Sequence, residues 1–252
     1  MTLIASHRGG SLEAPENSPT SFRHTAGLAV EQVEFDIHPT ADGQIVVIHD
    51  ATLDRTTDGR GPVAARTLAE LKALTITGTQ ADRIMTLAEV IELFRPTGIT
   101  LRMEVKSDAD HAPYPGLLDQ ALRLLDAAGM RGRCVVTSFL APIVGDAVQA
   151  PGLAGRIWLV SPVIMDDCGL EGVVATAEAH AIGHVGIRAS RLDARVMAHL
   201  RAAGLGVGAW AVNDADSVRR MLDLGVEVFT TDIPTSALAL RASVGGVSAR
   251  QA

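Results

Sequence analysis

Residues 117–139, LLDQALRLLDAAGMRGRCVVTSF, join a helical pattern to a short run of β-forming residues. Apolar residues from Leu117 to Ala128 recur at intervals of three and four, which predicts an amphipathic helix. Gly129 follows at a position typical of a helix C-terminus. Cys134–Phe139 is rich in β-branched residues and predicts a strand. A helix followed directly by a strand is the repeating unit of α/β folds.

The same alternation continues along the chain in both directions. No sequence motif repeats, but β-rich runs alternate with segments of helical spacing, and the runs are Leu3–His7, Glu31–Ile37, Thr100–Lys106, Cys134–Phe139, Arg156–Val160, His184–Arg188, Gly206–Val212 and Glu227–Thr231. Eight strands alternating with helices in 252 residues predict a closed parallel (β/α)8 barrel, the TIM barrel. The alternative is an open doubly wound sheet, which would favour a G-x-G-x-x-G turn after the first strand. The first strand instead ends in His7-Arg8-Gly9-Gly10.

Several helix boundaries are also visible in the sequence. Ser18 followed by Pro19 predicts an N-cap and the first residue of a helix. Gly204 and Gly225 follow apolar helical runs and suit helix C-termini.

One stretch, between the second and third barrel strands, departs from this rhythm. Gln44–Ile48 is a ninth β-like run, and the Asp42-Gly43 turn before it predicts an antiparallel return along the second strand. The remainder predicts a loop and a short helix, with too few apolar residues for an independent domain. We therefore expect one domain over residues 1–252, with a small insertion at about residues 45–85.

The composition argues against several classes of protein. Hydrophobic residues make up 47% of the chain and charged residues 20%, which argues against disorder. A formal net charge of −7, with one Tyr, two Trp and five Phe, disfavours a nucleic-acid-binding surface. No run of 18 apolar residues is present, so we expect no membrane span and no stable membrane insertion.

The N-terminus and the cysteines favour a cytoplasmic protein. MTLIASHRGG lacks the basic and apolar regions of a signal peptide. Cys134 and Cys168 have no metal-type spacing, and we expect both to be reduced and mostly buried. The sequence leaves a homo-oligomer open.

Three carboxylates fall near the ends of predicted barrel strands, where the reacting groups of such barrels lie. Glu34 and Asp36 are two residues apart and therefore share a strand face, and Glu104 shares a face with Lys106. Carboxylates converging inside a barrel repel one another unless a cation neutralises them. Oxygen ligands suit a hard ion, so we expect Mg²⁺ or Ca²⁺, and zinc less because cysteine is absent from the cluster.

Cationic side chains and two histidines join this cluster. Arg8 and Lys106 beside a divalent cation form an anion site, for which phosphate is the obvious ligand. His7 and His49 can serve as general base and general acid near neutral pH. Together these residue types indicate metal-assisted cleavage of a phosphoester.

The motifs that carry these residues occur in a recognisable order. HRGG is followed by PENS, then E-x-D, the HD of VVIHD, E-x-K, and finally W followed by TTD. In that order, from His7 to Pro234, they resemble the glycerophosphodiester phosphodiesterase family. The resemblance implies a TIM barrel that hydrolyses a small-molecule glycerophosphodiester to glycerol 3-phosphate and an alcohol.

The resemblance also implies a role for each matching residue. The resemblance makes Glu34, Asp36 and Glu104 the metal ligands, and His7 and His49 the acid/base histidines. It makes Arg8 and Lys106 the phosphate-contacting cations, and Trp210 an apolar residue lining the pocket. The nucleophile is either the adjacent glycerol hydroxyl or water, and the sequence does not order the two histidines as acid and base.

Other readings remain open from the sequence. One alternative is a lysophospholipase D-like enzyme acting on lysophospholipids, and another is a barrel that only binds phosphorylated ligands. Structural roles are predicted for two polar residues: Asp232 as a cap of the helix near Pro234, and Asn17 in ordering the loop before the first helix. A structural ion pair between Glu104 and Lys106 is an alternative to their roles at the metal and the phosphate. The other six histidines are expected to be packing or surface residues: His24, His38, His111, His180, His184 and His199.

Overall fold

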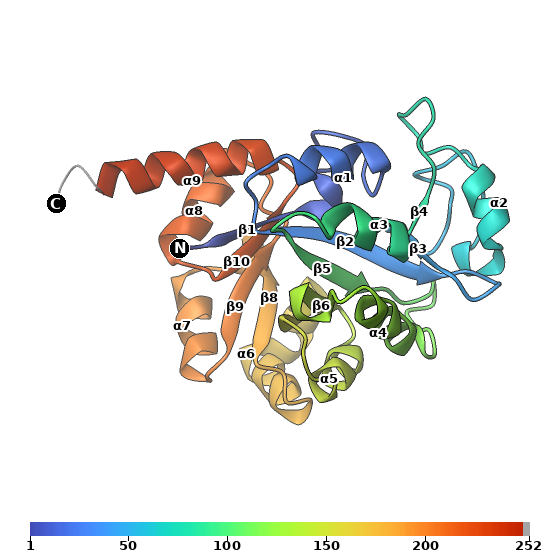
Figure 1. Ribbon diagram of the computed structural model, residues 1–252. Coiled ribbons are helices and arrows are strands. Elements are labelled where there is room, and N and C mark those ends of the chain that lie inside the picture. The colour runs from blue at the N-terminus through green and yellow to red at the C-terminus, as the bar shows by residue number, and fades with distance from the viewer. Residues whose placement is uncertain (249–252) are drawn as a thin grey trace.

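The computed structural model describes residues 1–248, in which eight parallel strands form a closed ring (Figure 1). The strands of the ring are β1 (Leu3–Ser6), β2 (Gln32–Pro39), β5 (Thr100–Val105), β6 (Cys134–Ser138), β7 (Gly155–Val160), β8 (His184–Arg188), β9 (Gly206–Trp210) and β10 (Val228–Thr231). The ring closes because β1 pairs with β10 on one side and with β2 on the other. The predicted TIM barrel is confirmed, each predicted strand lies within two residues of an observed one, and the doubly wound alternative is wrong.

Helices follow the strands and cover the outside of the barrel (Figure 1). They are α1 (Pro19–Ala26), α3 (Leu87–Phe94), α4 (Leu117–Ala127), α5 (Ala141–Gln149), α6 (Pro162–Ala179), α7 (Ala194–Ala202), α8 (Ala215–Leu224) and α9 (Pro234–Ser248). Short 3-10 helices lie at η1 (His7–Gly9), η2 (Val63–Ala65), η3 (Arg131–Arg133) and η4 (Ala189–Arg191). The main apolar core fills the layer between strands and helices. There Phe22 of α1 packs edge-on against Phe35 of β2 and Phe94 of α3.

The predicted helix boundaries are confirmed. Ser18 caps α1 in a capping box with Ser21, and Pro19 is the first helical residue. Gly225 ends α8 in the left-handed conformation, with φ of 65°, which an L-residue side chain would disfavour.

The segment between β2 and β5 lies outside the ring of eight strands, on the right in Figure 1. β3 (Ile45–Val47) pairs antiparallel with β2, which confirms the predicted return of the chain, and β4 (Met85–Thr86) pairs with β3. Between them lies α2 (Leu68–Ala73). A small apolar cluster that includes Val46, Leu53 and Leu71 packs this segment onto β3. That the segment is an insertion into the barrel stays a prediction.

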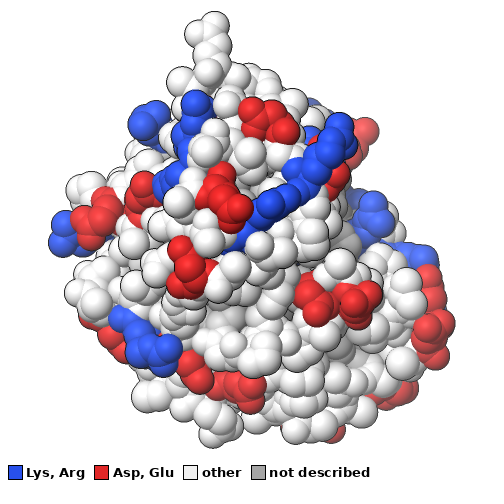
Figure 2. All heavy atoms as spheres, turned by 90° about the vertical axis from the view of Figure 1, so that its right-hand side faces the viewer, with Lys and Arg blue, Asp and Glu red and all other residues white. Residues whose placement is uncertain are grey.

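The carboxyl ends of the parallel strands lie at the right-hand end of the barrel in Figure 1, where β2 points. Figure 2 views the molecule from that side and shows basic and acidic side chains interspersed with uncharged surface. No helix within residues 1–248 combines the length and the apolarity needed to cross a membrane.

The two cysteines differ in their surroundings. Cys134 is fully buried at the start of β6, and burial raises the pKa of its thiol to about 12. Cys168 is exposed on α6, so the prediction that both thiols are mostly buried is wrong for Cys168. It lies just before Gly169, where a positive φ of 65° kinks the helix.

Candidate active site

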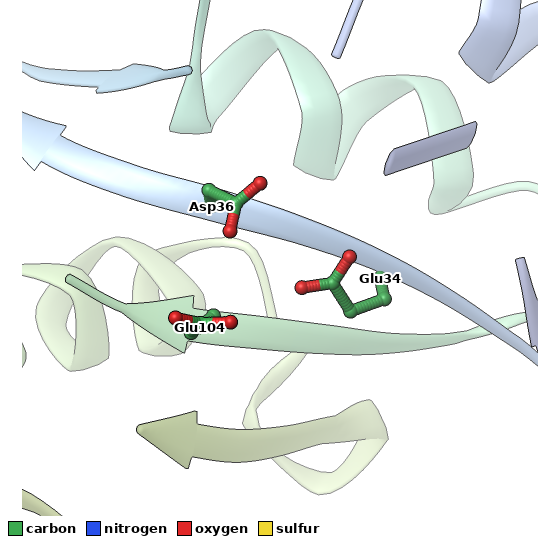
Figure 3. Close-up of side chains that lie close together, drawn as sticks. All are labelled: Glu34, Asp36 and Glu104. Carbon is green, nitrogen blue, oxygen red and sulfur yellow. The ribbon is translucent and has the colours of Figure 1, made fainter. Parts of the chain in front are cut away.

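Three buried carboxylates meet at the carboxyl end of the barrel (Figure 3). Glu34 and Asp36 project from β2, and Glu104 projects from the neighbouring β5, where it is in register with Asp36. One oxygen of each carboxylate lies within 4.8 Å of the others. All three residues are at most 5% exposed. A buried set of carboxylate oxygens fits a hard divalent cation such as Mg²⁺ or Ca²⁺, because the cation would neutralise their mutual repulsion.

The two carboxylates of β2 have pKa values displaced in opposite directions. Burial, reinforced by the charge of Asp36, raises the pKa of Glu34 to about 7. Burial also opposes ionisation of Asp36, but neighbouring cations, with Lys106 foremost, hold its pKa far below its ordinary value. A bound cation would favour the ionised form of Glu34.

Lys106 is placed between two of these carboxylates. Its Nζ lies 2.6 Å from Glu104 Oε1 and 3.0 Å from Asp36 Oδ1. Although burial alone would lower the pKa of Lys106, these two carboxylates raise it above its ordinary value. The Glu104–Lys106 ion pair, an alternative from the sequence, is therefore present, and Asp36 extends it.

His7 follows β1 and is held by a residue from the far end of the chain. Its Nδ1–H donates to Asp232 Oδ1 at 2.5 Å, and its Nε2 lies 3.8 Å from Glu34 Oε2. Burial alone would lower the pKa of His7, but Glu34 and Asp232 raise it above its ordinary value. Asp232 also accepts from Ser11 and Asn213. The prediction that Asp232 caps α9 is wrong, because its carboxylate turns into the site, and Glu13 accepts from the backbone N–H of Thr235 instead.

His49 follows β3 and has the same arrangement with a different aspartate. Its Nδ1–H donates to Asp50 Oδ1 at 2.6 Å. Arg55 then donates to both Asp50 and Glu16, with two hydrogen bonds of 2.7 to 2.9 Å to each. Glu16 in turn accepts from Arg8 Nη1 at 3.0 Å. A chain of charged pairs thus links the residue after β3 to the loop after β1.

Arg8 lies in a tight loop that its neighbours explain. It has a positive φ of 51°, its backbone N–H donates to Glu34 Oε2 at 3.1 Å, and its Nε is 3.6 Å from Asp36 Oδ2. The following Gly9 has φ of 81°, and a Cβ there would lie 2.5 Å from Ser21 Oγ and 2.9 Å from the Ser21 backbone. The glycine therefore lets the loop approach α1 closely, which keeps Arg8 against the acidic cluster.

A cavity of about 230 Å³ lies beside the cluster. His7, Arg8, Glu34, His49, Glu104 and Trp210 all line it, so six of the eight predicted site residues share one space. Trp210 packs edge-on against Phe139, with ring centroids 5.5 Å apart, and its Nε1–H donates to the Gly186 carbonyl. Asp36 stays behind this surface, in contact with Lys106 and Arg8.

A larger cavity of about 870 Å³ adjoins the first, and His49, Glu104 and Phe139 line both. Lys106 lines the larger one, as do the polar residues Asp50 and Asp108 and the apolar residues Leu140 and Ile164. The two cavities therefore meet at the histidine and carboxylate that end β3 and β5.

Sequence reasoning missed several residues of this site. Asn17, expected only to order a loop, donates from Nδ2 to Asp36 Oδ2 at 2.9 Å. Buried His38 donates from Nε2 to the His49 carbonyl at 3.1 Å and accepts from the Tyr114 hydroxyl at 3.2 Å. His7 donates a hydrogen bond to Asp232 and His49 donates one to Asp50, and Arg55 in turn donates to Asp50. The PENS, HD and TTD motifs contain Asn17, Asp50 and Asp232, but none of these motifs indicated the residue that its member contacts.

Comparisons with known proteins match nearly the whole chain. The model of the Glycerophosphoryl diester phosphodiesterase family matches residues 7–236. A glycerophosphodiester phosphodiesterase of Caldanaerobacter subterraneus subsp. tengcongensis is 30% identical over 250 residues, which cover 95% of this chain and 97% of the relative.

Solved structures agree with the sequence comparison. A candidate glycerophosphoryl diester phosphodiesterase from Agrobacterium tumefaciens str. C58 is 43% identical with a TM-score of 0.94, and the match covers 96% of this chain and 98% of that one. An Oleispira antarctica phosphodiesterase, solved in complex with the product sn-glycerol-3-phosphate, is 26% identical with a TM-score of 0.81 and covers 96% and 97% of the two chains.

Proposed function

Because this chain belongs to the glycerophosphoryl diester phosphodiesterase family, we propose that its two histidines drive a metal-dependent hydrolysis of glycerophosphodiesters. The chain is a glycerophosphodiester phosphodiesterase, as its relatives are. The metal and the histidines are the proposed part. The observation that supports them most is the convergence of Glu34, Asp36 and Glu104 beside a cavity that His7 and His49 also line.

The cation would be held by the three carboxylates, as Mg²⁺ or Ca²⁺. When bound, it neutralises charge that develops on the phosphate and lowers the pKa of a nearby hydroxyl. Lys106 holds Asp36 and Glu104 in place, because its ammonium lies within 3.0 Å of an oxygen of each, and its charge lowers the pKa of Asp36. Asn17 holds Asp36 from the other side through a hydrogen bond to Oδ2.

His7 and His49 move the protons of the reaction. One takes the proton of the attacking hydroxyl as the new P–O bond forms, and the other protonates the alcohol oxygen as its P–O bond breaks. The attacking hydroxyl belongs either to water or to the neighbouring glycerol carbon, in which case water opens the resulting cyclic phosphate. Asp232 and Asp50 accept from the Nδ1–H of the two rings, which leaves Nε2 as the atom that exchanges a proton with the substrate.

The remaining site residues orient the substrate. Arg8 offers a guanidinium at the wall of the cavity and binds phosphate oxygen there. Lys106 lines the adjoining cavity and adds positive charge on the side of the alcohol. Trp210 supplies an apolar surface for the carbon atoms of the substrate.

The direct test is release of sn-glycerol 3-phosphate by the purified protein from glycerophosphocholine and glycerophosphoethanolamine, with Mg²⁺ or Ca²⁺ and with excess EDTA. We expect product with either diester in the presence of an ion and none with EDTA. Full turnover in EDTA would remove the metal from the reaction. Lysophosphatidylcholine is assayed in the same way. Faster hydrolysis of this lipid than of the two glycerophosphodiesters would show that the preferred substrate is a lysophospholipid.

A further inference from the structure

The deeper end of the 230 Å³ cavity carries two buried polar side chains that the reaction above does not use. Arg102 of β5 is 1% exposed and Thr137 of β6 is fully buried, and both line the cavity. Arg102 shares its strand face with Glu104 but lies two residues earlier, in register with Glu34. It therefore lies one layer deeper in the barrel than the Asp36–Glu104 pair.

The donors of these two side chains lack acceptors. Within residues 1–248, Arg102 Nη2 and Thr137 Oγ1 make no hydrogen bond, and Arg102 Nη1 reaches Gln32 Oε1 only at 3.5 Å. A buried guanidinium with a single hydrogen bond of 3.5 Å and a buried hydroxyl with none cost folding free energy, and such groups are kept where a ligand uses them.

We propose that Arg102 and Thr137 bind the hydroxyl groups of the glycerol moiety and so select diesters that contain glycerol. This inference rests on the proposed function, since it assigns the glycerol end of the same substrate. Both side chains donate, and glycerol hydroxyl oxygens accept, so the pairing satisfies the two groups that lack partners.

The arrangement of the two cavities places glycerol at this deeper end. The phosphorus must lie at the acidic cluster and within reach of both histidines, which fixes the middle of the substrate. The cavity of about 870 Å³ meets this point at His49 and Glu104 and has room for the alcohol. Glycerol then extends toward Arg102, where Leu159 and Trp210 line the same space and contact its carbon atoms.

Binding of two ligands tests the proposal. Calorimetry at a fixed Mg²⁺ concentration compares sn-glycerol 3-phosphate with inorganic phosphate for the wild type, Arg102→Met and Thr137→Val. We expect Arg102→Met to raise the Kd for glycerol 3-phosphate by about 10- to 100-fold, the usual effect of losing hydrogen bonds to a charged group. Thr137→Val should raise this Kd by a smaller factor. Phosphate binding should be unchanged in both variants. Thr137→Ser keeps the hydroxyl and should bind as the wild type does.

Thermal unfolding of the same variants distinguishes a ligand-binding arginine from a structural one. Replacing a buried charge that makes only one long hydrogen bond by an apolar side chain of similar size is often neutral or stabilising. We therefore expect the Tm of Arg102→Met to match or exceed that of the wild type. A lower Tm together with unchanged preference for glycerol 3-phosphate would overturn the proposal. If Arg102→Met does not fold, the isosteric Thr137→Val is tested with glycerol 3-phosphate and phosphate instead. A preference for glycerol 3-phosphate equal to that of the wild type would then overturn the proposal.

Turnover separates this inference from the proposed reaction. Glycerophosphocholine contains glycerol, and bis(p-nitrophenyl) phosphate does not, so Arg102→Met should lose kcat/KM only for the first. If the wild type hydrolyses neither diester but binds glycerol 3-phosphate through Arg102, the reaction is wrong and the subsite stands. If the wild type hydrolyses glycerophosphocholine and Arg102→Met does so equally well, the subsite is wrong and the reaction stands.

Discussion

His7 and His49 lie in loops after different strands, yet each donates Nδ1–H to an aspartate, at 2.5 Å to Asp232 and 2.6 Å to Asp50. The aspartate fixes the tautomer and the orientation of the ring, as in other acid/base sites built on histidine. The two pairs differ in surroundings, because Glu34 lies beside His7 whereas Arg55 binds the aspartate of His49. The two imidazole rings are thus oriented by different sets of neighbours.

Removing either imidazole should abolish most turnover. We expect His7→Ala and His49→Ala to lose about 10²- to 10⁴-fold in kcat, the usual contribution of a general acid or base. Steady-state release of glycerol 3-phosphate measures the loss, and circular dichroism confirms folding. A folded variant with near-wild-type kcat would exclude that histidine from the reaction.

Changing the aspartates tests whether they position the rings. Asp232→Asn and Asp50→Asn remove the charge but keep the size, so we expect kcat to fall by between about tenfold and 10⁴-fold with little change in KM. Asp216→Asn is the matched control, since Asp216 is exposed and, among residues 1–248, its ion pair is with Arg219 at the surface. Equal kcat in all three variants would contradict the positioning role.

The buried imidazole of His38 should make stability depend on pH. Burial lowers its pKa to about 4 from 6.5, so the unfolded chain binds a proton between these values and the folded chain does not. The stability contributed by neutral His38 is therefore complete above pH 6.5 and is lost as the pH falls toward 4, by about 3 kcal/mol at most. Urea unfolding of the wild type and His38→Gln from pH 7 to 4 measures the difference. Parallel profiles would show that His38 does not titrate in this way.

At the scale of elements, the segment between β3 and β4 contributes to the site through Arg55. This side chain is 47% exposed, and exposed ion pairs add little to stability. Its four hydrogen bonds nevertheless hold Asp50, which orients His49, and Glu16, which holds Arg8. The segment therefore matters for geometry more than for folding.

Arg55→Met should separate these two effects. We expect kcat to fall about 10- to 100-fold while the free energy of unfolding changes by less than about 1 kcal/mol. Arg60→Met in the same segment is the control, because the Arg60 side chain is 86% exposed and, in the described part of the chain, forms an ion pair of 3.6 Å with exposed Asp54. A variant of Arg55 with the kcat of the Arg60 variant would exclude the linkage.

The elements themselves were largely predictable from the sequence, for physical reasons. Barrel strands are short apolar runs between helices of regular spacing, and capping residues such as Ser18 mark where helices begin. The spacing of Glu34 and Asp36 predicted a shared face, and register with β5 brings Glu104 beside them.

Contacts between distant loops were not predictable. Nothing near Asp232 in the sequence indicates that it meets His7, 225 positions away, because the pairing depends on closure of the ring by β1 and β10. Arg102 was overlooked because a single arginine in a strand has no motif, and only its burial makes it unusual.

At the scale of the whole molecule, a bound divalent cation should stabilise the fold. It would bind the folded state alone, since the unfolded chain does not bring the carboxylates of β2 and β5 together. At 100 times its Kd, the ion adds about 2.7 kcal/mol, which for a chain of this size raises the Tm by several degrees.

Thermal unfolding in EDTA, in Mg²⁺ and in Ca²⁺ measures this shift without any substrate. Glu34→Gln keeps the shape of the side chain but removes a ligand charge, so its Tm should respond much less to either ion. A wild-type Tm that is the same in all three solutions would rule out a resident cation at this cluster.

Closure of the ring by the first and last strands has a consequence for synthesis of the protein. The partner of His7 lies beyond β10, so a nascent polypeptide on the ribosome has both histidines and all three carboxylates long before it has Asp232. We therefore expect hydrolysis to begin only after translation has passed the final strand, and a chain terminated before Asp232 to turn over far more slowly than the full chain.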